Sequence, residues 1–146
     1  MENVRVYEMP PCKMVASQSG MFGDGKLEVF SEWFGSLPIT MFPKDYLWYD
    51  KDKGGFAWYY MYDESMTVPN DFNIIDFPGG LYLVATDIDG QDNTEAMNAI
   101  KNFIKEKGCF EIDKSRKELG NIITSPSAYK VMGYNQMDYY VPVKIK

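Results

Sequence analysis

The side chains that most often perform chemistry near neutral pH are scarce in this sequence. It contains no histidine and two cysteines, Cys12 and Cys109. The usual general base, the Ser-His and Cys-His nucleophile pairs and the commonest zinc ligand are therefore missing. Cys109 follows Gly108 at the expected end of a helix, where the helix dipole disfavours a thiolate. We expect no catalytic cysteine, no bound metal and no cofactor.

Two other patterns resemble ligand-binding loops but lack the residues that such loops need. Counted from Asp87 as a calcium loop, the sequence has Asp92 instead of the required glycine and Asn98 instead of the final acid. The glycines at positions 20, 23 and 25 fit neither common phosphate-loop pattern. We interpret these glycines as a flexible loop. We interpret the acids as a solvated turn with a helix cap: Asp87, Asp89, Asp92 and Glu95.

Aromatic side chains are the most unusual part of the composition. The chain of 146 residues has 3 Trp, 11 Tyr and 9 Phe, together 16% of it, and 10 Met. Rings and thioethers fill the core of many β-rich proteins. They also line broad pockets for apolar or cationic organic molecules. Composition leaves both interpretations open.

Charge and hydropathy favour a protein of the cytoplasm. Acidic residues outnumber basic ones by 21 to 15, a net charge of −6, so we do not expect binding to nucleic-acid phosphates. The first residues lack the basic start and apolar run of a signal peptide, and no segment approaches the roughly 20 apolar residues that span a bilayer. Two cysteines without a disulfide pattern suit a reducing compartment. We predict a cytoplasmic protein that binds neither DNA nor membranes.

Hydrophobic periodicity predicts two similar halves. In the first half, Gly35 and Pro38 end a helix, and a polar loop with terminal glycines joins the last two strands. In the second half, Asp92 and Glu95 have the spacing of a capping box, and Gly108 suits a helix C-terminus. The predicted helices are 26–37 and 92–107, and the predicted strands are 4–9, 13–19, 46–49, 56–62, 72–77, 81–86, 128–132 and 139–145.

The two halves have matching apolar patterns. Phe30, Trp33 and Phe34 of the first helix correspond to Ile100, Phe103 and Ile104, 70 positions later. We therefore predict one α+β domain of duplicated β-α-β-β units, with halves at approximately 1–68 and 69–146. Its expected form is an antiparallel sheet with helices on one side, pseudo-twofold symmetry and a central cleft.

Four segments carry a resemblance to a known family: Val6–Pro10, Trp48–Asp50, Phe77–Tyr82 and Asp138–Lys144. In this order they resemble the gyrase-inhibitor-like (GyrI-like) effector-binding domain, over nearly the whole chain. That domain is attached to AraC-type and MerR-type transcription regulators and also occurs as a free-standing protein. The resemblance implies a pseudo-twofold α+β domain whose aromatic cleft binds bulky, often cationic or planar, organic molecules. Because the resemblance begins within a few residues of Met1, we expect a stand-alone member.

The sequence departs from the family at one position. The resemblance implies a glutamate at the pocket floor that neutralises ligand cations, and Lys130 stands at the corresponding position in this sequence. A lysine repels a cation that a buried carboxylate would attract. Either the ligand is neutral or anionic, or Glu32 or Glu111 replaces the glutamate, or the alignment is shifted by a residue or two. Lys130 pointing outward from an edge strand is a further alternative.

We predict a stand-alone small-molecule-binding protein for apolar or aromatic organic ligands, with cationic ones included. Two alternatives come from the family: hydrolysis of electrophilic xenobiotics in the same cleft, which we favour less, and inhibition of DNA gyrase. The expected partner is a small organic ligand, and a regulator or gyrase is the alternative protein partner. No catalytic residue is assigned. The predicted ligand-binding residues are Trp33, Trp48, Tyr49, Trp58, Tyr60, Phe110, Tyr129 and Lys130.

Overall fold

The computed structural model describes residues 3–146, and this range contains nine strands and three helices. The described residues form two compact units, unit 1 (residues 3–10 and 79–146) and unit 2 (residues 11–78). Strand pairing within both units is antiparallel, which confirms the predicted α+β class. None of the helices between residues 3 and 146 has the length and apolar character to cross a membrane.

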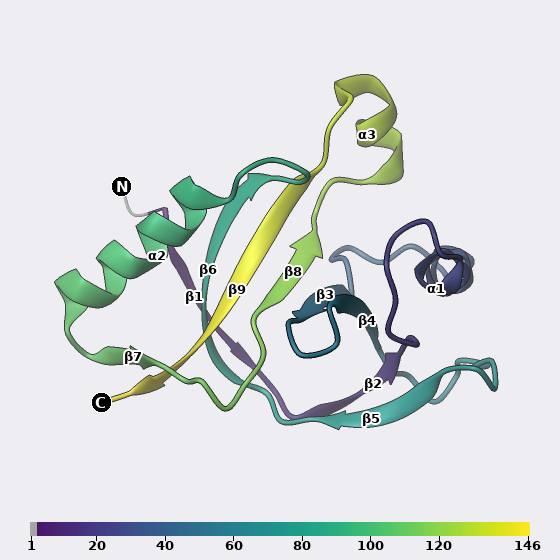
Figure 1. The fold of residues 1–146 in the computed structure, drawn as a ribbon, viewed down its shortest axis with the longest axis horizontal. Coiled ribbons are helices and arrows are strands. Elements are labelled where there is room, and N and C mark those ends of the chain that lie inside the picture. The colour runs from purple at the N-terminus through teal and green to yellow at the C-terminus, as the bar shows by residue number, and fades with distance from the viewer. Residues whose placement is uncertain (1–2) are drawn as a thin grey trace. The chain divides into compact units, whose positions relative to one another are not determined.

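The sheet of unit 1 has helix α2 (Thr94–Lys107) along one side (Figure 1). Its strands run in the order β1 (Arg5–Met9), β6 (Gly80–Ile88), β9 (Gln136–Ile145) and β8 (Leu119–Ile122). A short strand, β7 (Phe110–Ile112), pairs with the C-terminal part of β9. Apolar side chains of α2 pack on one face of this sheet and form its core: Ala96, Ile100 and Phe103 against Leu83, Ala85, Val141 and Val143.

Local sequence explains where α2 begins and ends. Asp92 Oδ1 accepts a hydrogen bond from the backbone N–H of Thr94 at 2.9 Å, which satisfies one donor that the first helical turn leaves unpaired. The predicted capping box of Asp92 and Glu95 is wrong, because Asn93 is the N-cap residue and makes no side-chain cap. Gly108 ends the helix at a φ of 68°, as predicted, because glycine adopts this left-handed conformation without strain.

Unit 2 repeats this arrangement of sheet and helix. Its strands run in the order β3 (Asp45–Asp50), β4 (Gly55–Met61), β2 (Cys12–Ala16) and β5 (Asn73–Phe77). Helix α1 (Lys26–Gly35) ends at Gly35, two residues before the predicted end at residue 37, and its Phe30 is fully buried. Side chains of both faces of β4 are buried. The helix packs into a ring-rich core: Val15, Leu27, Phe30, Trp58, Tyr60 and Phe72.

The strand order shows how the strands of the two repeats are distributed between the two units. The order β1-β6-β9-β8 in unit 1 corresponds to β5-β2-β4-β3 in unit 2, with one helix after β6 and one after β2. Strand β1, the first of repeat one, therefore pairs with β6 in unit 1, which contains α2. Strand β5, the first of repeat two, pairs with β2 in unit 2, which contains α1. This exchange gives unit 1 the residues 3–10, whereas the expected halves were continuous. It also brings β1 into the same sheet as β9, from the opposite end of the chain.

The predicted strand at 128–132 is wrong, because this segment forms helix α3 (Pro126–Met132). Ser125 Oγ accepts a hydrogen bond from the Ala128 N–H at 3.1 Å, and Pro126 occupies the first helical turn. Gly133 ends the helix at a φ of 81°. Strand β8, which pairs with β9, was not among the predicted strands. Lys130 therefore lies on a short helix and not on an edge strand.

The turn before β8 is stabilised by one carboxylate. Asp113 Oδ1 accepts hydrogen bonds from the Ser115 hydroxyl at 2.6 Å and the Ser115 N–H at 3.0 Å. Asp113 Oδ2 accepts one from Arg116 Nε at 2.9 Å. The Ser115 hydroxyl and the Arg116 side chain are the largest causes that lower the pKa of Asp113 to about 2.

This pKa predicts a pH dependence of stability. Asp113 has a folded-state pKa of about 2, below the unfolded value of about 3.9, so its ionised form favours the folded protein. Its contribution is present above about pH 4 and is lost as the pH falls from about 4 towards about 2. We expect Asp113→Asn to be less stable than the wild type at neutral pH, with a difference that shrinks in acid. Urea unfolding across this pH range measures it, with the exposed Asp76→Asn as control. A difference independent of pH would contradict the assignment.

Candidate functional site

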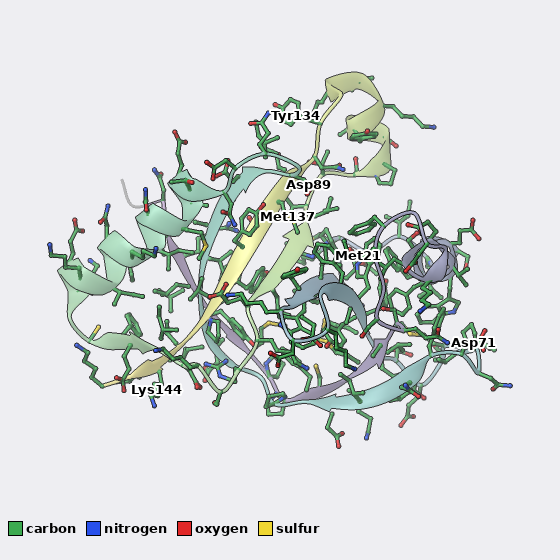
Figure 2. The ribbon with its side chains drawn as sticks, in the orientation of Figure 1. Met21, Asp71, Asp89, Tyr134, Met137 and Lys144 are labelled. Carbon is green, nitrogen blue, oxygen red and sulfur yellow. The ribbon has the colours of Figure 1, made fainter. Side chains whose placement is uncertain are left out.

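One face of the unit 1 sheet carries polar and aromatic side chains. Successive side chains of a strand point to opposite faces, and Val141 faces α2, so Tyr140 and Asp138 lie on the other face. Asp138 follows Met137, which Figure 2 places towards one end of β9, with Lys144 towards the other. The pairing register puts Thr86 opposite Asp138. We call this surface the polar-aromatic face; its residues are Arg5, Tyr7, Tyr82, Thr86, Asp138 and Tyr140.

Asp138 is the central charge of the polar-aromatic face. Only 3% of the residue is exposed. Its Oδ1 accepts hydrogen bonds from Arg5 Nη2 and from the Thr86 hydroxyl, both at 2.6 Å. Its Oδ2 accepts one from Arg5 Nη1 at 3.1 Å. The carboxylate is therefore buried and paired in a bidentate arrangement, which is the strong geometry for an Arg–carboxylate pair.

Arg5 makes further contacts within the same group of residues. Its Nη2 donates to Thr86 Oγ1 at 2.9 Å and its Nη1 donates to Tyr7 Oη at 2.8 Å. The hydrogen bond with Asp138 is the largest cause that raises the pKa of Arg5 above its ordinary value, so the guanidinium is charged at every relevant pH. Its side chain is 38% exposed, so the ion pair is buried at the carboxylate and open to solvent at the guanidinium.

Three tyrosine rings lie on the same sheet face as this ion pair. The ring of Tyr7 lies edge-on to that of Tyr140, with centroids 6.0 Å apart, and Tyr140 lies edge-on to Tyr82 at 5.8 Å. The guanidinium carbon of Arg116 lies 4.8 Å from the centroid of Tyr82. Tyr82 and Tyr140 are buried and Tyr7 is partly exposed. Packed rings beside a few polar and charged groups are the composition typical of organic-ligand sites.

Three of the predicted ligand-binding residues lie together in the core of unit 2. Trp33, Trp58 and Tyr60 belong to the ring cluster beneath α1, with Trp58 and Tyr60 buried. Each indole N–H has an acceptor: Trp33 Nε1 donates to the Thr67 carbonyl at 3.1 Å, and Trp58 Nε1 donates to Asp45 Oδ2 at 3.2 Å. Burial is the largest cause that raises the pKa of Asp45. These three residues stabilise the helix–sheet packing.

The remaining predicted residues lie at separate places. Trp48 faces away from α1, opposite Ala57, whereas Tyr49 lies on the α1 face and is largely exposed beside Phe56. Phe110 packs near Phe103 of α2, with centroids 6.3 Å apart. Tyr129 and Lys130 are exposed on α3.

Neither acid considered as a substitute for the family glutamate is buried. Glu32 is exposed on α1, and Glu111 is exposed in β7, where it lies 3.8 Å from Lys144 Nζ. The buried carboxylate of unit 1 is Asp138, which the sequence-based residue set omitted. The sequence does contain a sign that Asp138 is special, because this acid interrupts the apolar run of residues 137–143. A charge buried within such a run requires a partner. That partner, Arg5, lies 133 positions away, and no local pattern connects the two.

Within residues 3–146, no group of three acidic, cysteine or histidine side chains is arranged to hold a metal ion. The polar-aromatic face offers hydrogen-bonding groups, charges and aromatic rings.

No protein-family model and no curated protein sequence matches this chain. Solved structures do match its fold. A structure described as a hydrolase from Listeria innocua has a TM-score of 0.67 at 10% identity, covering 98% of this chain and 92% of that one. The EcmrR C-terminal domain has a TM-score of 0.64 at 12% identity, covering 97% and 96%. SAV2435, solved bound to tetraphenylphosphonium, has a TM-score of 0.59 at 9% identity, covering 97% and 93%.

At these identities the likeness establishes the fold. The chain shares the α+β fold of the EcmrR C-terminal domain and SAV2435 over nearly its whole length. This is the fold that the resemblance to GyrI-like effector-binding domains implied.

Proposed function

We propose that this protein is a GyrI-like effector-binding domain that binds an apolar or aromatic organic molecule. The observation that carries the proposal is the polar-aromatic face: a buried carboxylate, held by Arg5 and Thr86, that shares the sheet face opposite the helix with three tyrosine rings. The fold supports it, because a protein with the same fold was solved with the aromatic cation tetraphenylphosphonium.

Tyr7 and Arg5 are the proposed ligand contacts on this face. Both side chains are partly exposed, whereas Tyr82 and Tyr140 are buried. A ligand ring can therefore pack on Tyr7 and the guanidinium plane without unfolding the sheet. Interactions of this kind give aromatic contacts about 0.5 to 1.5 kcal/mol beyond burial of their area.

The residues predicted from the sequence differ in how a ligand would reach them. Trp48, Tyr49, Tyr129 and Lys130 have accessible side chains and remain proposed contacts. A ligand at Trp33, Trp58, Tyr60 or Phe110 would have to enter the packing of α1 or α2. We also propose a cytoplasmic location, which the two free cysteines support.

A ligand screen with a matched pair of variants tests this proposal. Neutral aromatics, planar cations and organic anions are titrated while tryptophan fluorescence and calorimetry are recorded. We expect at least one class to saturate at micromolar to low-millimolar concentration and Tyr7→Ala to weaken it several-fold. Tyr134→Ala is the control, because Tyr134 is similarly exposed but lies beyond α3. Absence of binding by all three classes, or equal weakening by both variants, would contradict the proposal.

Hydrolysis is the second candidate, because a structure with the same fold is described as a hydrolase. Here both oxygens of Asp138 already accept hydrogen bonds from Arg5 or Thr86, which favours a binding role over that of a general base. Product formation from any bound compound would reverse this preference.

A further inference from the structure

Arg5 occupies the groups on the polar-aromatic face that would otherwise recognise a cation. We propose that Arg5 determines ligand charge: its guanidinium is an internal counter-ion of Asp138, so that the face selects neutral aromatic ligands and excludes organic cations. This inference rests on the proposed function and adds the class of ligand.

The first argument is that both oxygens of the carboxylate already accept hydrogen bonds. Oδ1 of Asp138 accepts two hydrogen bonds and Oδ2 accepts one, and Arg5 supplies two of the three. The residue is 3% exposed, so an approaching cation meets the guanidinium before it meets the acid. To reach Asp138, the cation would have to break a bidentate pair whose acid is desolvated, and removing one partner of such a pair costs several kcal/mol.

The second argument is that a tyrosine face is also engaged. The guanidinium carbon of Arg5 lies 5.3 Å from the centroid of the Tyr7 ring, within the distance at which a cation is attracted to a ring face. A carboxylate and an aromatic face are the two features that attract an organic cation, and Arg5 is bound to both. The Arg5 guanidinium therefore occupies the place that an organic cation would take between the Asp138 carboxylate and the Tyr7 ring.

The third argument concerns the donors of Arg5 itself. Nη1 donates to Asp138 and Tyr7, and Nη2 donates to Asp138 and Thr86, so the four N–H bonds of these two nitrogens have acceptors. An anionic ligand gains no bidentate partner at these nitrogens. The Arg5–Asp138 pair has no net charge, and its open side presents the flat guanidinium beside a ring. That surface suits a neutral aromatic molecule.

The test compares two probes that carry phenyl rings on phosphorus and differ in charge. Tetraphenylphosphonium is the cation and triphenylphosphine oxide is the neutral probe. We expect Arg5→Met to bind tetraphenylphosphonium at least about tenfold more tightly than the wild type, and to show no gain in affinity for triphenylphosphine oxide, because it loses the guanidinium contact with that probe's rings. The gain should weaken as salt rises from about 0.05 M to about 0.5 M.

Three further variants identify the cause. Arg5→Met combined with Asp138→Asn should lose the gain, because the unmasked charge is then removed. Arg5→Lys should keep excluding the cation, because it retains the positive charge. Arg5→Gln should behave as Arg5→Met does, and it replaces that variant if Arg5→Met does not fold. Circular dichroism and thermal unfolding show that each variant is folded.

The outcomes separate this inference from the proposed function. If the wild type binds the neutral probe but binds the cation as tightly as Arg5→Met does, the inference is overturned and the proposed function stands. A gain that survives Asp138→Asn overturns it as well. If neither probe binds to any variant, both the inference and the proposed binding at this face are overturned.

Discussion

Replacement of Arg116 by methionine should lower the free energy of unfolding by about 3 to 5 kcal/mol. Arg116 Nη2 donates to the carbonyls of Leu81 and Val143 at 2.9 and 2.6 Å, and Nη1 donates to that of Gly79 at 3.0 Å. The side chain is 12% exposed and Nε binds Asp113. Methionine has a similar length but no donor, so these acceptors would lose their partner in a nearly dry environment.

Equilibrium unfolding in urea, followed by circular dichroism, measures this effect. Lys114→Met is the matched control, because Lys114 lies in the same turn and is exposed. We expect that control to change the free energy of unfolding by less than about 0.5 kcal/mol. If Arg116→Met and Lys114→Met have equal stabilities, the hydrogen bonds to the three carbonyls do not contribute as argued.

Substitution of Phe30 by alanine should destabilise the protein by a comparable amount, about 3 to 5 kcal/mol. The Phe30 side chain is 0% exposed, and its ring lies 4.9 Å from Phe72 and 5.6 Å from Trp33, measured between centroids. It also approaches Phe34 at 5.7 Å. Alanine would leave a cavity among rigid rings, which cannot collapse into it fully.

Val29→Ala is the control for this substitution, because Val29 is the preceding residue of α1 and is 52% exposed. Urea unfolding should show a much smaller loss for Val29→Ala than for Phe30→Ala. Tryptophan fluorescence should also change in the folded Phe30→Ala variant, since Trp33 and Trp58 both contact the lost ring. A loss below about 1 kcal/mol would show that the cluster repacks and that its rings are not held as described.

Local sequence patterns predicted most helices and strands, because the spacing of apolar residues in a segment matches the period of the backbone that the segment forms. The helix expected at 26–37 is α1 (Lys26–Gly35), and the hairpin expected around residues 50–55 joins β3 and β4. The prediction failed at α3, where the short run of residues 128–132 has no length to distinguish a strand from a helix. There the outcome depended on a capping serine, a proline and a glycine that flank the run.

The sequence by itself predicted the α+β class, the duplicated units and the two long helices, because the apolar spacing that identifies each helix and strand is local and the two halves repeat the same pattern. Tertiary structure alone decided which strands exchange between the repeats and which charges meet. Asp138 and Arg5 lie 133 positions apart and become a pair only when β1 and β9 both flank β6. Side-chain pairing across a sheet depends on strand order and register, and neither is encoded in the local pattern of a single strand.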